Sequence, residues 1–356
     1  MSASQLKYET TEEMVEFRSG RNLFYRKTVT TFPTSNRSPP DQNKKHRLNI
    51  LFVHGSCAAS SQYDSLVTEL GTVIQTNENI GTTPTSTSIN DTGVGVGVDS
   101  MHCHLYDQLG CARSKHPSND WDAYSSDEHH LDLKCIAQSF LQSDGEKNNT
   151  SGSLAAKFYI VAHSYGVSQT IKLVNSLPAS DAAKISGLVL IGGAVKGGPG
   201  SLAKDGGHWI FSRYVPMTIL RMMQPSLSRS FAEAAIHPSN MEKMIESGCT
   251  DVSKGNDMAM CKAFYRQQEY ATKEEASMIK VKSLVVHGAG DKIFPLSEAE
   301  SLYEALGNPY QITSIPEASH QVFEERPQVV AKAMVNFIFS QTSGTYLARD
   351  KSIVPN

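Results

Sequence analysis

Residues 161–166, VAHSYG, contain the strongest candidate for chemistry, a serine flanked by small residues. The apolar run KFYIVAH leads into Ser164, and YGVSQTIKLVNSL follows it with helical spacing. A serine at such a strand–turn–helix junction lies on a sharp turn that exposes its hydroxyl, so the residues two before and two after it must be small. Gly166 fits this requirement, and Ala162 exceeds glycine by one methyl group. We predict that Ser164 is a nucleophile; the alternative is an ordinary helix N-cap.

Two later segments supply partners for this serine, whose hydroxyl is a weak nucleophile until a base removes its proton. HGAGDKIFP places Asp291 after one apolar run, and PEASHQVFEERP places His320 after the next. We predict that His320 takes the proton of Ser164 and that Asp291 holds the imidazole in the required tautomer. The stretch after the preceding apolar run has no carboxylate before Asp205, which favours Asp291 as the acid.

An oxyanion hole needs two backbone N–H donors near the nucleophile. We predict the N–H of Tyr165, the residue after the nucleophile, and the N–H of Ser56 in the loop after LFVHG, with Cys57 as the alternative to Ser56. Three histidines beside these motifs are interpreted as structural: His54, His163 and His287.

Apolar runs alternate with segments of helical spacing along most of the chain. The runs cover residues 48–55, 101–107, 157–163, 185–194, 283–288 and 310–315, and a hairpin is expected at 14–29. Helices are expected at about 60–70, 127–142, 165–177, 296–306 and 327–341. This alternation predicts an α/β fold, a mostly parallel central sheet flanked by helices.

The domain boundaries follow from the interruptions of this alternation. Residues 1–194 form the N-terminal part of the core, with a flexible, Thr/Ser/Asn/Gly-rich insertion at about 75–100. Residues 195–278 have no strand signal and are interpreted as an inserted helical cap. Residues 279–345 complete the core, and 346–356 form a tail.

The cap segment contains an apolar, methionine-bearing stretch, HWIFSRYVPMTILRMMQPSL. We predict that Trp209, Met222 and Met223 contact an acyl chain, because thioethers adapt to irregular apolar ligands. With Arg213 and Arg221, the stretch is also a candidate for peripheral membrane contact. The alternative is ordinary packing of a helix on the core.

Composition excludes several classes of protein. The 356 residues carry 33 Lys plus Arg against 36 Asp plus Glu, a net charge of −3 that argues against nucleic-acid binding. No apolar run approaches the roughly 18 residues of a transmembrane helix. The polar, acidic start lacks the apolar core of a secretory signal, and the six cysteines form no C-x-x-C pair, so we expect an intracellular, cytoplasmic protein with reduced thiols. The chain has no phosphate-binding glycine motif and no metal-ligand cluster, so no cofactor and no metal are expected.

Five motifs occur in order along the chain: HGSCAAS, YDQLGCARS, VAHSYG, VHGAGDKIFP and EASHQVFEERP. Together they resemble the α/β-hydrolase superfamily, over about residues 49–340 apart from the insertion and parts of the cap. The chain looks most like the abhydrolase-domain serine hydrolases grouped with monoacylglycerol lipases and lysophospholipases. It is similar in particular to the animal abhydrolase-domain-containing proteins of subfamily eight. In the D-x-x-G-x-G-x-S loop of that family, Ala112 replaces a glycine.

These inferences predict a serine hydrolase that cleaves small-molecule or lipid-like carboxylic esters through an acyl-enzyme. Two alternatives stay open, a lysophospholipid acyltransferase and a non-catalytic binding protein of the same fold. The resemblance implies an H-x-x-x-x-D motif at the histidine of such acyltransferases, whereas here His320 is followed five positions later by Glu325.

Overall fold

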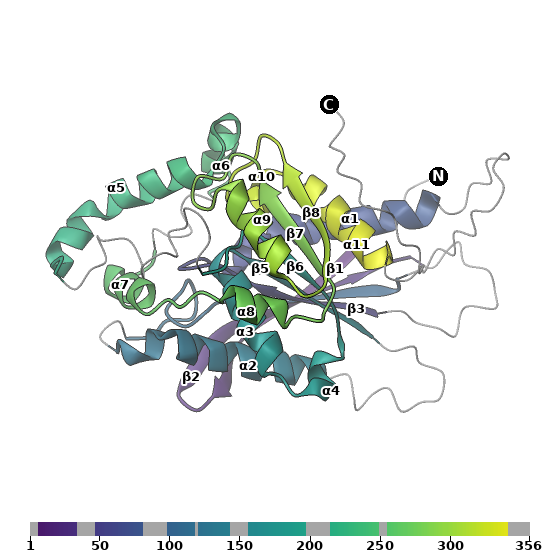
Figure 1. The fold of residues 1–356 in the computed structure, drawn as a ribbon, viewed down its shortest axis with the longest axis horizontal. Coiled ribbons are helices and arrows are strands. Elements are labelled where there is room, and N and C mark those ends of the chain that lie inside the picture. The colour runs from purple at the N-terminus through teal and green to yellow at the C-terminus, as the bar shows by residue number, and fades with distance from the viewer. Residues whose placement is uncertain are drawn as a thin grey trace.

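The computed structural model describes residues 6–33, 47–80, 98–117, 120–142, 156–196, 214–248 and 255–340. Within them, eight strands form one sheet in the order β1-β2-β4-β3-β5-β6-β7-β8 (Figure 1). The strands are β1 (Lys7–Arg18), β2 (Arg21–Thr31), β3 (Arg47–Val53), β4 (Ser100–Tyr106), β5 (Lys157–His163), β6 (Ile185–Ile191), β7 (Ser283–Gly288) and β8 (Pro309–Ile315). β1, β2 and β4 pair antiparallel, and all other pairs are parallel. The predicted α/β fold is confirmed.

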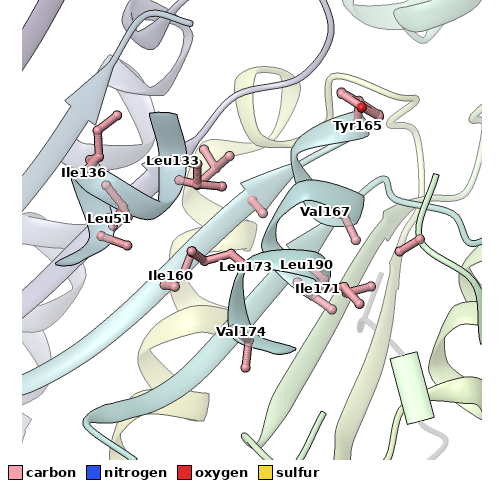
Figure 2. Packing of buried hydrophobic residues seen from close by; sticks show 14 of the residues in the cluster. Leu51, Leu133, Ile136, Ile160, Tyr165, Val167, Ile171, Leu173, Val174 and Leu190 are labelled. Carbon is pink, nitrogen blue, oxygen red and sulfur yellow. The ribbon is translucent and has the colours of Figure 1, made fainter. Parts of the chain in front are cut away.

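Helices cover both faces of the sheet, which explains why its central strands are apolar throughout. One face packs against α1 (Asp64–Ile80) and α11 (Pro327–Ser340). The other packs against α2 (Ser126–Gln142), α3 (Tyr165–Ser176) and α9 (Leu296–Ala305). Figure 2 shows Val167, Ile171, Leu173 and Val174 of α3 beside the strands, with Leu133 and Ile136 of α2 close by. This packing fixes the start of α3 relative to the carboxyl ends of the parallel strands.

Two predicted boundaries were wrong. β1 begins at Lys7, well before the predicted start at residue 14, because most of its side chains are exposed and leave no apolar run. α1 continues to Ile80 and so includes residues 75–80 of the predicted insertion. The remainder of that insertion up to residue 97 lies outside the described residues.

The described part of the segment predicted as a cap contains helices and no strand. It contains α5 (Met217–Ala235), α6 (Met241–Glu246), α7 (Met258–Arg266) and α8 (Lys273–Ser277). α5 lies at the periphery, away from the sheet, with α6 near its C-terminal end (Figure 1). The remaining elements are η2 (Ser60–Tyr63), η3 (Asp122–Tyr124), α4 (Ala179–Ala182), η6 (Pro238–Asn240) and α10 (Val322–Glu325).

Candidate active site

Ser164 lies on the turn between β5 and α3, with φ 54° and ψ −123°. A non-glycine residue in this left-handed region is strained and persists only where the surroundings enforce it. The N–H of Ser164 donates to the carbonyl of Ile191 at 2.9 Å, which fixes the turn against β6. A Cβ added at Gly166 would lie 2.5 Å from the carbonyl oxygen of Val53, so only glycine fits there. The small residue predicted after the serine is therefore a steric requirement of this turn.

The structure brings the three predicted residues Ser164, His320 and Asp291, below called the triad, into one hydrogen-bonded chain. Ser164 Oγ lies 3.0 Å from His320 Nε2, and His320 Nδ1 lies 2.8 Å from Asp291 Oδ2. Because a carboxylate only accepts hydrogen bonds, it fixes the imidazole proton on Nδ1 and leaves Nε2 to accept from the serine hydroxyl. This arrangement can remove the serine proton.

Asp291 is built to stay ionised. Its Oδ1 accepts from the backbone N–H groups of Ile293 and Phe294 at 2.8 and 2.9 Å. Burial alone would raise the pKa of Asp291, but the electrostatic interaction with His320, the hydrogen bond from His320 and the electrostatic interaction with His287 outweigh burial and lower that pKa. The acid therefore orients His320 as a carboxylate.

The two framework histidines next to the triad are buried and neutral. His163 Nε2 donates to the backbone carbonyl of His320 at 3.0 Å, and burial lowers the pKa of His163 well below its usual value. His287 is fully buried, with Nε2 3.9 Å from Asp291 Oδ2, and burial lowers its pKa also. His163 thus holds the loop that carries the triad histidine.

The loop after β3, the predicted source of one oxyanion donor, runs directly beside Ser164. A Cβ added at Gly55 would lie 2.9 Å from the Cβ of Ser164. His54 stabilises this loop with two hydrogen bonds: its Nδ1 donates to the carbonyl of Gly55 and its Nε2 accepts from the N–H of Gln108, both at 2.9 Å. The N–H of Tyr165 opens α3, where the helix leaves its first N–H groups without helical partners.

Two residues of the segment predicted as a cap contact this loop and escaped the sequence analysis. Gln268 Nε2 donates to Ser56 Oγ, and Asn256 Nδ2 donates to the carbonyl of Cys57. Cys57 has a φ of 53°, so the bond from Asn256 supports a strained peptide. The contacts join residues about 200 positions apart and leave no local sequence pattern.

The loop after β4 is held by its own aspartate. Asp107 accepts from the N–H of Ser60 at 2.8 Å and from that of Arg113 at 3.0 Å. Ala112 has a φ of 41°, a backbone conformation that favours glycine.

Two of the three predicted acyl contacts, Met222 and Met223, lie on α5. Met222 is 82% exposed on α5, so its side chain lies in solvent. Met223 packs against the buried pair Leu220 and Met258, the ordinary helix packing considered as the alternative. Trp209 lies outside the described residues.

The described part of the chain holds no group of three or more His, Cys, Asp or Glu residues placed to bind a metal ion. Nor is any helix in that part long and apolar enough to cross a membrane.

A mostly parallel sheet with a serine on a strand–helix turn, and an acid and a histidine on later loops, is the architecture of the α/β-hydrolases. The family model described as serine aminopeptidase, S33, matches residues 89–327, and the chain belongs to that family. The predicted superfamily is thereby confirmed, whereas the subfamily is not. No curated protein matches the chain.

Solved structures of α/β-hydrolases resemble the whole fold. An enol-lactonase from Burkholderia xenovorans LB400 matches with a TM-score of 0.61 and 16% identity over 92% of this chain and 100% of that one. An esterase from Exiguobacterium antarcticum matches with a TM-score of 0.58 and 12% identity over 89% and 96% of the two chains. An esterase from Rhodococcus sp. ECU1013 matches with a TM-score of 0.57 and 15% identity over 94% and 99%. At these identities the likeness establishes the fold. The family match makes the chain a serine-type α/β-hydrolase.

Proposed function

We propose that the protein hydrolyses carboxylic esters through an acyl-enzyme on Ser164. The observation that carries the proposal is the bridging position of His320, 3.0 Å from Ser164 Oγ and 2.8 Å from Asp291 Oδ2. A base within hydrogen-bond reach of the nucleophile, oriented by a third group, is the geometry that activates a serine.

In the proposed reaction, Ser164 Oγ attacks the ester carbonyl while its proton moves to His320 Nε2. The N–H groups of Tyr165 and Ser56 stabilise the oxyanion of the tetrahedral intermediate. His320 then gives the proton to the departing alcohol, which leaves an ester between the acyl group and Ser164. Water, deprotonated by His320, attacks this ester and releases the acid, returning Ser164 to its starting state.

We further propose that the acyl group is lipid-like and that α5 touches a membrane surface. Support comes from large exposed apolar side chains gathered on and around this helix: Tyr214, Ile219, Met222, Phe231 and Ile245. Arg221 on the same helix is exposed and could meet anionic head groups.

The hydrolase proposal is tested by labelling with a fluorophosphonate, which phosphonylates activated serines, and locating the adduct by peptide mass spectrometry. We expect one adduct on Ser164 and none in Ser164→Ala, together with a loss of ester turnover on the order of 10³-fold or more. Unlabelled wild-type protein without esterase activity would favour the binding-protein alternative. Transfer of the acyl group to a lysophospholipid in preference to water would favour the acyltransferase, and faster release of aminoacyl nitroanilides than of esters would indicate a peptidase.

The lipid proposal is tested with p-nitrophenyl esters of increasing acyl length. Since each buried methylene contributes about 0.8 kcal/mol, kcat/KM should rise from acetate to at least octanoate. Flotation with vesicles of phosphatidylcholine, with and without phosphatidylserine, tests membrane contact separately. Acetate as the best substrate would refute the lipid-like acyl group, and absence of protein from both vesicle fractions would refute membrane contact.

A further inference from the structure

Glu325, on the short helix α10 behind the triad histidine, has a buried carboxylate held from two sides. Its side chain is only 2% exposed. Oε1 accepts from the backbone N–H of Ser319 at 2.8 Å, immediately before His320. Oε2 accepts from the N–H of His237 and from Asn240 Nδ2, both at 2.8 Å. One carboxylate thus joins the histidine loop to the segment that follows α5.

Further hydrogen bonds tie the same two parts together. The N–H of Gln321 donates to the carbonyl of Ala235 at 3.0 Å. Ser319 Oγ lies 3.1 Å from the carbonyl oxygens of both Ala234 and Gly290, the latter next to Asp291. Asn240 reaches the loop a second time, through its bond to the carbonyl of Glu317 at 2.7 Å. Both chain neighbours of His320 are therefore bonded to the last residues of α5.

We infer that Glu325 is a positioning residue: it fixes the loop of His320 against the end of α5, so that the alignment of the base depends on the docking of this helix. The inference rests on the proposed function for its catalytic consequence. Its physical basis is that a buried carboxylate accepting three hydrogen bonds cannot lose one set of donors without leaving polar groups unsatisfied.

The length and acceptor character of the glutamate are both needed. Aspartate is one methylene shorter and cannot span the same donors from the same backbone position. Glutamine has the length, but it replaces one acceptor oxygen by an NH₂ group, which would face an N–H donor on one side. At this position, five residues after the histidine, the glutamate therefore acts in structure and not as a reacting group.

The test compares Glu325→Gln and Glu325→Asp with a matched control, Glu324→Gln. Glu324 lies on the same helix, is also buried, and accepts from Gln62 Nε2 of η2 at 2.9 Å. Asn240→Ala removes one donor on the α5 side and leaves Glu325 intact. Melting temperatures establish that each variant is folded at the assay temperature.

We expect Glu325→Gln to lower kcat for a p-nitrophenyl ester and the rate of fluorophosphonate labelling on the order of 10- to 100-fold, with little change in KM, because the loss falls on the step that needs His320. Asn240→Ala should give a smaller loss in the same direction, roughly fivefold. Glu324→Gln should keep wild-type kcat. The downfield proton resonance of His320 Nδ1–H reports the same alignment directly, and it should broaden or shift in the Glu325 variants alone.

Folded Glu325→Gln with wild-type kcat, labelling rate and resonance would overturn the inference. So would equal losses in Glu324→Gln, because they would assign the effect to general stability. Should the Glu325 variants fail to fold, wild-type kcat in Asn240→Ala would overturn it. If the wild-type protein neither labels nor turns over esters, the proposed function fails, while the resonance still decides whether Glu325 aligns His320.

Discussion

The loops around the triad and the helix α5 differ in how their residues are held. In the loops, the carboxylate of Asp291 accepts three hydrogen bonds, and Ser164 and Cys57 are held in left-handed conformations by their surroundings. On α5, by contrast, only Leu220 and Ala235 are buried, and Met222 is 82% exposed. The difference separates residues fixed by unique steric and hydrogen-bonding demands from residues that are replaceable without strain.

The two regions nevertheless meet at the end of α5. Ala234 and Ala235 bond to the residues on either side of His320, so the loosely packed helix is anchored where the site is most constrained. We therefore expect substitutions at Ala234 and Ala235 to disturb the site more than substitutions on the exposed face of α5.

The largest effect should come from the centre of the constrained region. Asp291→Asn keeps the shape of the side chain but presents an NH₂ group or a neutral oxygen to His320 Nδ1, which favours the wrong tautomer. We expect a loss of up to about 10⁴-fold in kcat with KM little changed. Ester hydrolysis followed under saturating substrate measures this loss, and full activity of Asp291→Asn would contradict the assignment of the acid.

A pair of Gly→Ala substitutions makes the same chemical change, one added methyl group, in each of the two regions. In Gly166→Ala the new Cβ would meet the carbonyl oxygen of Val53 at 2.5 Å, backbone that cannot move aside. In Gly255→Ala, in the segment predicted as a cap, the new Cβ meets nothing within 4 Å. We expect Gly166→Ala to lower the free energy of unfolding by about 3 kcal/mol or more and to abolish labelling of Ser164. Gly255→Ala should stay within about 0.5 kcal/mol; urea denaturation measures both, and equal stabilities would contradict the proposed steric requirement.

The sequence predicted the elements whose residues give a strong apolar signal. The strands at 157–163 and 283–288 have the predicted bounds, since both are buried on two faces and read as unbroken apolar runs. β1 was predicted too short because its first residues are polar and exposed and leave no apolar run. The position of the serine turn followed from local sterics, which sequence records in the small residues at 162 and 166.

What escaped prediction depends on contacts across the fold. Gln268 and Asn256 contact the loop of Ser56 and Cys57 from positions 212 and 199 residues away. Glu325 was noticed only as a departure from an aspartate motif, and nothing local indicates that its partners are His237 and Asn240. Such roles follow from three-dimensional packing that one sequence does not reveal.

The buried histidines predict a third, intermediate effect. Burial, with the charge of Arg21, lowers the pKa of His129 to about 3, and burial lowers that of His104 to about 3. The ordinary value is about 6.5, so between these values the unfolded chain binds protons that the folded protein does not. The contribution of these two histidines to the free energy of unfolding is therefore fully present above about pH 6.5 and is lost as the pH falls below that value.

His129→Phe should remove one such group and reduce the slope of unfolding free energy against pH by about 1.4 kcal/mol per unit between roughly pH 6 and 4. Phenylalanine suits the site because His129 already packs edge-on against Phe264, with ring centroids 4.9 Å apart. Urea unfolding at several pH values compares the variant with the wild type. Parallel curves would mean that His129 is protonated in the folded protein.

The smallest effect is expected on the outer surface of α5. Met222→Gln exchanges a side chain that is 82% exposed for a polar one of similar length, with good helix propensity retained. The free energy of unfolding should therefore stay within about 0.5 kcal/mol of the wild type, and the rate of acetate ester hydrolysis should not change.

The buried neighbour supplies the matched comparison, since Leu220→Ala removes a fully buried side chain and should lower the free energy of unfolding by about 2–5 kcal/mol. If α5 meets lipid, Met222→Gln should weaken vesicle binding and octanoate turnover on vesicles while leaving soluble acetate turnover unchanged. A stability loss in Met222→Gln approaching that of Leu220→Ala would instead mean that the outer face of α5 is covered in solution, and the contrast between the two regions would fail.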